Sequence, residues 1–293
     1  MNRTISKVAV TLIAVILITA GANAIVKAED KKAIPDHSGL GLPDCEYCHA
    51  GINSMWKASD TGHSKALSRV INAKQATADC YACHSAEGFA AKLQGEKIDI
   101  TQRSSFSAVT CIVCHDPKKK GSDHLLVMES EKLCNSCHTQ RAVLKGQGAR
   151  GIEDTRSVHS AVDCVSCHMT EGNHRMKVLR PDDPALTDKR LDTCTACHKD
   201  NNRKARARQL QEWQSTYDEE MKPLQADVDA INAALKKKPD LLSPELKTRF
   251  DNVTANFLVL AKDMSRGAHN FDYALEIMAL AKSDLKEIKA ATK

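Results

Sequence analysis

Cys45-Glu-Tyr-Cys-His49 is the first of six Cys-x-x-Cys-His strings, which recur through the first two-thirds of the chain. The string is typical of c-type haem attachment, in which two thiols bond the vinyl groups of the porphyrin and the adjacent histidine ligates the iron. All twelve cysteines of the chain belong to the six strings, so none is left for a disulfide. We therefore expect six covalently bound haem c groups. Their attachment residues should be Cys45, Cys48, Cys80, Cys83, Cys111, Cys114, Cys134, Cys137, Cys164, Cys167, Cys194 and Cys197, with His49, His84, His115, His138, His168 and His198 as proximal iron ligands.

Paired cysteines also occur in zinc sites and in thioredoxin-like redox pairs. Zinc would not need a histidine directly after every second cysteine, and a redox pair would not recur six times. The pattern therefore favours haem. Because covalent haem attachment takes place outside the cytoplasm, we expect a periplasmic or extracellular protein.

Residues 1–28 have the pattern of a secretory signal peptide. Arg3 and Lys7 precede an uncharged stretch, 8–26, which is followed by small-residue cleavage sequences ending at Ala24 and Ala28. We expect cleavage after Ala28, or alternatively after Ala24. An uncleaved anchor is the other alternative, since the nineteen uncharged residues just reach membrane-spanning length. Only in that case would the protein contact the membrane.

The composition suits a core filled by haem. Aromatic residues make up only 4% of the chain, and large flat porphyrins would supply the missing apolar bulk. The formal charge of +5 is incomplete, because the propionates of six haems add about −12 and six ferric irons about +6. We therefore expect no nucleic-acid partner, and interpret the basic runs as solvated charges or partners of propionates.

Residues 29–200 are expected to form a hexahaem domain of short helices and loops. The strings begin 23 to 35 residues apart, so each haem should lie in edge contact with another. No sustained alternation of apolar and polar residues indicates a sheet. The expected fold class is therefore mainly α.

Residues 201–293 contain no cysteine, and their apolar residues recur every three or four positions, as on one face of a helix. One stripe runs from Leu210 to Leu235 and a second from Leu246 to Ile288. Ser243 should cap the second helix, with Pro244 at its first position. The sequence thus predicts a long helical hairpin that packs on the haem domain.

Six histidines lie outside the strings, which equals the number of second axial ligands that six haems need. His269 would share a helical face with Tyr273 and Ile277, apart from the stripe that packs on the partner helix, so its imidazole should reach a haem. His159 should serve a haem other than that of the string it precedes. The predicted distal ligands are His37, His63, His124, His159, His174 and His269.

His37 is the first candidate for a histidine that does not bind, because it lies near the expected mature N-terminus, where chains are often disordered. One haem would then have an open position or a methionine ligand. Met169 and Met176 are the nearest methionines to consider.

Several segments resemble the multihaem cytochromes c that include ammonia-forming nitrite reductase, hydroxylamine oxidoreductase and octahaem tetrathionate reductase. The resemblance covers residues 37–290, and segment 267–274 is similar to the long C-terminal helix in which those proteins place a distal histidine. The nitrite reductases usually carry Cys-x-x-Cys-Lys at the catalytic haem, and this sequence has no such string. The segments are Trp56-Lys-Ala-Ser59 followed by His63, Cys80-Tyr-Ala-Cys-His-Ser-Ala-Glu-Gly-Phe89, Val109-Thr-Cys-Ile-Val-Cys-His-Asp-Pro117, and His159 ahead of Cys164-Val-Ser-Cys-His-Met169.

The function we expect is electron transfer between redox partner proteins, a donor and an acceptor, through closely packed and mostly bis-histidine haems. The first alternative is a nitrite or sulfur-oxyanion reductase with one open haem and cationic donors such as Arg103, Arg141 and Arg156. The others are a membrane-anchored quinol dehydrogenase and a homo-oligomeric conductor in which a distal histidine crosses between subunits.

Overall fold

Helices and loops make up the described chain. The structure, a computed structural model, describes residues 45–59, 62–119, 123–184, 186, 191–199 and 202–292. These ranges hold eleven α-helices, five short 3-10 helices and no strand, so the predicted mainly α class is confirmed. None of the helices in these ranges combines the length and the hydropathy that a membrane span requires. The expected signal peptide, 1–28, and His37 lie outside the described residues.

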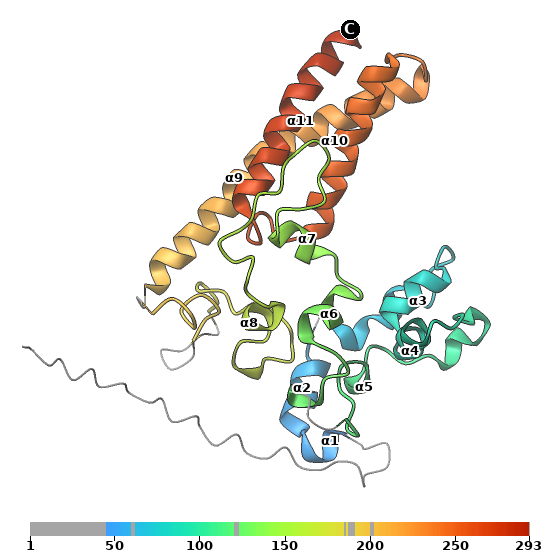
Figure 1. The fold of residues 1–293 in the computed structure, drawn as a ribbon, viewed down its shortest axis with the longest axis vertical. Coiled ribbons are helices and arrows are strands. Elements are labelled where there is room, and N and C mark those ends of the chain that lie inside the picture. The colour runs from blue at the N-terminus through green and yellow to red at the C-terminus, as the bar shows by residue number, and fades with distance from the viewer. Residues whose placement is uncertain are drawn as a thin grey trace, which may run out of the picture. The chain divides into compact units, whose positions relative to one another are not determined.

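Short helices carry most of the attachment strings (Figure 1). One helical turn brings residues i and i+3 side by side, so the two thiols of a string face the same way. The string-bearing helices are α1 (Cys45–Cys48), α3 (Ala78–His84), α5 (Cys111–Cys114), α6 (Ser130–Asn135) and α8 (Cys164–His168). The other short elements are α2 (Ala50–Lys57), α4 (Ala86–Gln94), α7 (Gln140–Leu144) and the 3-10 helices His63–Lys65, Leu67–Arg69, Ile100–Ser105, Asp123–Leu125 and Thr170–Gly172.

Three long helices follow: α9 (Arg203–Lys237), α10 (Pro244–Asp263) and α11 (Phe271–Ala291). Ser243 caps α10 as predicted, because its Oγ accepts a hydrogen bond from the Leu246 amide at 3.3 Å, and Pro244 stands in the first turn. α11 packs against both α9 and α10 (Figure 1). Their shared core includes Leu224, Val228, Ile231, Phe250, Val253, Phe257, Tyr273, Ile277, Leu285 and Ile288.

The second apolar stripe forms two helices instead of the single helix that its spacing predicts. α10 ends at Met264, whose φ of 58° is left-handed. Gly267 has a φ of 86°, which glycine adopts readily, and a Cβ there would come within 3.1 Å of the Phe271 ring. Asn270 then caps α11 by accepting a hydrogen bond from the Tyr273 amide at 3.2 Å. The hairpin is therefore built from three helices.

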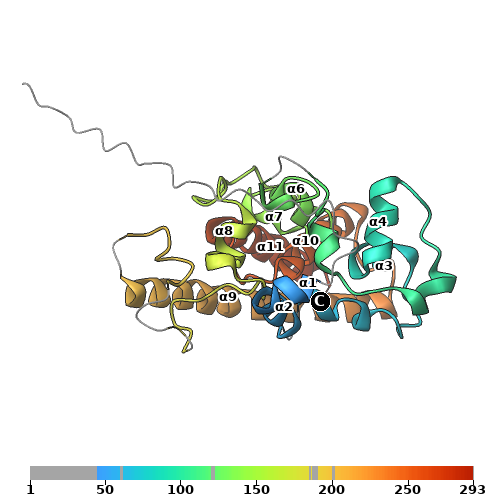
Figure 2. The same ribbon diagram turned by 90° about the horizontal axis from the view of Figure 1, so that it is seen from below.

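The segment that follows α7 docks on α10 and α11 (Figures 1 and 2). Asn256 accepts a hydrogen bond from the Arg150 amide at 2.7 Å and donates from Nδ2 to the carbonyl of the same residue at 3.0 Å. Gly146 permits the close approach in this segment, because a Cβ there would lie 1.8 Å from the Thr155 carbonyl oxygen. This docking joins the two predicted domains within one compact unit, 36–293. The boundary at residue 200 stays a prediction.

Candidate haem-binding sites

Each attachment string places two thiols and an imidazole together, and we number these six haem sites in chain order. The sixth string lies in a turn, where Asp192 Oδ1 accepts hydrogen bonds from the amides of Cys194 at 2.9 Å and Thr195 at 3.0 Å. Of the twelve attachment cysteines, Cys48 and Cys197 are exposed and the other ten are partly buried. Site 1 is Cys45, Cys48 and His49; site 2 is Cys80, Cys83 and His84; site 3 is Cys111, Cys114 and His115; site 4 is Cys134, Cys137 and His138; site 5 is Cys164, Cys167 and His168; site 6 is Cys194, Cys197 and His198.

Four of the predicted distal histidines face a proximal histidine of another string. Two metal–imidazole bonds of about 2 Å each would place the bonded nitrogens about 4 Å apart and the ring centroids about 6 Å apart. The observed separations match this distance, so the side chains fit an iron atom held between two imidazoles. The pairs are His63 with His138 at 5.9 Å (site 4), His174 with His115 at 6.3 Å (site 3), His159 with His198 at 6.1 Å (site 6) and His269 with His168 at 6.2 Å (site 5).

Backbone carbonyls orient several of these imidazoles. When Nδ1–H donates to a carbonyl, the ring is held in the tautomer that leaves Nε2 available for a metal. The Nδ1 atoms in question contact the carbonyl oxygens of Ala66 (from His84, 2.8 Å), His124 (from His115, 2.8 Å), Met176 (from His168, 3.2 Å) and Gly172 (from His174, 2.8 Å). Met176, a predicted alternative ligand, thus contributes its backbone to site 5.

Burial favours the neutral form of five site histidines, which is the form that ligates a metal. Burial, together with the nearby His138 and Arg69, lowers the pKa of His63 from 6.5 to about 4. Burial is also the main cause of a lowered pKa at His115, His138, His159 and His168.

His269 lies in the turn between α10 and α11, not on a helical face as its spacing predicts. Its Nδ1 contacts the Asp263 Oδ1 at 2.6 Å. The face of α11 that carries Tyr273 is covered by protein, since the Tyr273 hydroxyl accepts a hydrogen bond from the Ala149 amide at 2.8 Å. The predicted position was therefore wrong, although the imidazole still meets His168 at site 5.

Asp263 is absent from the sequence prediction. It stands six residues before His269, a separation that matches neither neighbouring position on a helix. Only the turn that ends α10 brings the two side chains together. The available signal was the pairing of Gly267 with the cap-forming Asn270, which together predict a helix end.

His49 and His124 both lie near site 3. Burial is the main cause of the lowered pKa of His115, the hydrogen bond to the His124 carbonyl opposes it, and nearby His49 is among the groups that lower it further. His84 of site 2 is close enough to lower the pKa of His138, and the described residues place no second imidazole opposite it. The predicted assignments of His37 and His124 to particular haems stay predictions.

Thiols of different sites lie close together in an order that differs from the sequence order. An attachment sulfur of site 1 lies beside one of site 3, site 2 beside site 4, site 4 beside site 5, and site 5 beside site 6. The pairs are Cys45 with Cys111, Cys83 with Cys137, Cys134 with Cys164, and Cys167 with Cys197. Cys114 of site 3 also interacts with both thiols of site 4.

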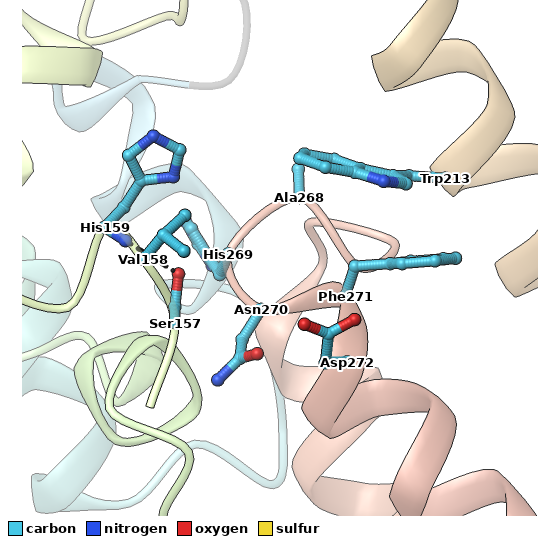
Figure 3. Close-up of a pocket in the computed structure, with 9 residues that line it drawn as sticks. All are labelled: Ser157, Val158, His159, Trp213, Ala268, His269, Asn270, Phe271 and Asp272. Carbon is cyan, nitrogen blue, oxygen red and sulfur yellow. Dashed lines mark hydrogen bonds between the residues drawn. The ribbon is translucent and has the colours of Figure 1, made fainter. Parts of the chain in front are cut away.

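A small cavity of about 70 Å³ is lined by the distal histidines of sites 5 and 6. Figure 3 shows His159 and His269 on one side of it and the rings of Trp213 and Phe271 on the other. These two rings stack with centroids 5.7 Å apart at 20°. The cavity therefore lies where the hairpin meets the haem sites, next to the turn that carries His269.

Comparison with known proteins agrees with this geometry. The family model described as "Doubled CXXCH motif" matches residues 105–143, and that described as "Cytochrome c554 and c-prime" matches residues 44–116. The solved structure of Outer Cell Wall Cytochrome OcwA is similar, with a TM-score of 0.67 and 25% identity over 80% of this chain and 50% of that one. The chain is a multihaem c-type cytochrome. Haem c is attached covalently through its Cys-x-x-Cys-His strings.

Two further structures share the fold of this cytochrome. The undecahaem cytochrome from the S-layer of Carboxydothermus ferrireducens gives a TM-score of 0.57 and 22% identity over 77% of this chain and 40% of that one. The cytochrome c nitrite reductase NrfA of Desulfovibrio desulfuricans gives a TM-score of 0.56 and 15% identity over 79% of this chain and 70% of that one. Together with the family models and OcwA, they confirm the predicted resemblance to multihaem cytochromes c. The chain spans about half the length of OcwA, and no curated protein sequence matches it significantly.

Proposed function

We propose that this cytochrome carries electrons between redox partner proteins outside the cytoplasm, through six covalently bound haem c groups. The observation that carries the proposal is the set of four imidazole pairs with centroids 5.9 to 6.3 Å apart. Haem iron exchanges single electrons, and two histidine ligands leave it no free position for a substrate. At least four of the six sites therefore favour conduction over catalysis.

The contacts between attachment thiols support one route through the protein. Sites 1, 3, 4, 5 and 6 are neighbours in that order, and site 2 branches from site 4. Site 4 is consequently the junction of the route. Cys48 of site 1 and Cys197 of site 6 are exposed, so the two ends of the route are the positions at which a donor and an acceptor would dock.

A location outside the cytoplasm is supported by the relatives. One similar structure is an outer cell wall cytochrome and another is a cytochrome of an S-layer. Covalent haem attachment and the signal-like segment 1–28 point the same way. We propose that the mature protein begins after residue 28.

The nitrite-reductase alternative is the second candidate function. It would need one haem with an open face at which a small anion could be reduced. Arg141 is committed elsewhere, because it is largely buried, pairs with Glu131 at 2.8 Å and donates to the Val162 carbonyl at 2.9 Å. Arg103 and Arg156 are exposed, and a catalytic role for either would need an anion to bind beside it.

Low-temperature EPR of the oxidised holoprotein separates the two functions. A conductor should show low-spin ferric signals from all six haems, and no change on adding nitrite or cyanide. A high-spin signal of one haem that converts on adding cyanide would favour the reductase. If the high-spin signal is the same in wild type and in His37→Ala, then His37 is not a ligand of the open haem. High-spin signals from more than two haems would refute bis-histidine conduction.

A further inference from the structure

His269 differs from the other oriented site histidines in what holds its Nδ1. Its partner is a carboxylate, Asp263 Oδ1 at 2.6 Å, and Asp263 is only 5% exposed. The second carboxylate oxygen accepts hydrogen bonds from the Ser265 amide at 3.3 Å and from the Ser265 hydroxyl. Both oxygens are thus occupied, and the carboxylate has a defined direction toward the imidazole.

The turn that presents this pair is anchored to α9. Gln214 donates from Nε2 to the Ser265 carbonyl at 3.1 Å, and the Arg266 guanidinium forms an ion pair with Asp218. Two contacts to a different helix hold the residues between Asp263 and His269 in place. The pair is therefore a built feature of the hairpin and not an incidental surface contact.

A carboxylate acts on an imidazole more strongly than a carbonyl does. Hydrogen bonds to ionised acceptors are about twice as strong as neutral ones, and an outer-shell carboxylate raises the basicity of the ligating nitrogen. A more basic ligand stabilises ferric over ferrous iron. At sites 2 and 3, by contrast, the Nδ1 atoms of His84, His115 and His174 meet neutral backbone carbonyls.

We propose that Asp263 is a positioning residue which, through His269, gives the haem of site 5 a lower reduction potential than the haems whose histidines meet only backbone carbonyls. The inference rests on the proposed function, in that it takes His168 and His269 as the two ligands of site 5. Because site 5 lies between sites 4 and 6 on the proposed route, its potential controls how readily electrons cross from the branched part to the site 6 end.

The test is Asp263→Asn in the holoprotein, followed by potentiometric titration with optical and EPR detection. Outer hydrogen-bond partners typically change metal affinity about 10- to 100-fold, and a tenfold change in a one-electron equilibrium is about 59 mV. The site 5 potential should therefore rise by at least that amount while its iron stays low-spin. Asp272→Asn is the matched control, since it removes an exposed carboxylate that lines the same cavity as His269 and lies in the first turn of α11, outside the turn that holds Asp263 and His269.

His269→Ala identifies the site 5 signal, because that low-spin signal should disappear in this variant. If no low-spin signal is lost, the ligation of site 5 is wrong and the proposed function fails at that site. If the signal is lost in His269→Ala but its potential is the same in wild type and Asp263→Asn, only the role of Asp263 is overturned. An equal shift in Asp272→Asn would overturn it too, since a general effect of charge would then explain the result.

Should Asp263→Asn fail to fold, Ser265→Ala provides an independent measurement. Removing the Ser265 hydroxyl takes one hydrogen-bond donor from the Asp263 carboxylate, which makes the carboxylate a stronger acceptor for the imidazole. The site 5 potential should therefore shift in the opposite direction, to lower values. An unchanged or raised potential in Ser265→Ala would contradict the proposal.

Discussion

Replacing Asn270 with alanine should lower the free energy of unfolding by about 3 kcal/mol. The Asn270 side chain is only 4% exposed and makes three hydrogen bonds. Its Oδ1 caps α11 through the Tyr273 amide, and loss of a cap costs about 1 kcal/mol. Its Nδ2 donates to the carbonyls of Thr155 at 2.6 Å and Val143 at 3.3 Å, and the loss of each hydrogen bond costs about 1 kcal/mol.

The assay is denaturant unfolding of the holoprotein, followed by far-ultraviolet circular dichroism for the helices and by the Soret band for the haems. Ser243→Ala is the matched control, because Ser243 caps α10 by accepting a hydrogen bond from the Leu246 amide at 3.3 Å on an exposed surface. It should lose only about 1 kcal/mol. Equal losses in the two variants would refute the argument that Asn270 also ties the segment after α7 to the hairpin.

Three further predictions address the haems and their ligands. The intact mass of the secreted protein should correspond to residues 29–293 with six haems; a smaller haem count or a retained N-terminus would contradict the corresponding part. His269→Ala should convert one haem to high spin while all six stay attached, and an unchanged EPR spectrum would show that His269 is not a ligand. The pKa of His63 is lowered from 6.5 to about 4. Between pH 6.5 and pH 4 the unfolded chain therefore binds a proton that the folded protein does not, so the free energy of unfolding should fall as the pH drops through this range. Unfolding free energies at pH 7 and pH 5 check this: they should differ in wild type more than in His63→Gln.

The parts of the fold that could be predicted from sequence are those set by neighbouring residues. The six attachment strings, the short helices that carry them and the cap formed by Ser243 with Pro244 all follow from local chemistry. The break at Gly267 was missed because the apolar spacing continues across the turn, so periodicity alone predicts one helix. That break moves His269 from a helical face into a turn.

The pairing of distal with proximal histidines could not be predicted, because it is a tertiary property. His63 faces His138, 75 residues later, and His174 faces His115, 59 residues earlier. The number of histidines predicts histidine as the second axial ligand, but it does not predict which histidine serves which haem. Asp263 was missed for the same reason, since its contact with His269 depends on a turn that the apolar spacing does not indicate.

The positions of the paired histidines along the chain determine the order in which the haem sites can be completed during synthesis. A chain synthesised from its N-terminus presents both imidazoles of site 4 once His138 has emerged, and both of site 6 once His198 has. Site 5 must wait until almost the whole chain has been exported, because its second imidazole is His269. A polypeptide truncated before His269 could thus receive every haem and still leave an iron exposed to solvent and oxygen. Haem attachment at His168 and ligation by His269 are thereby separated by 101 residues of the chain.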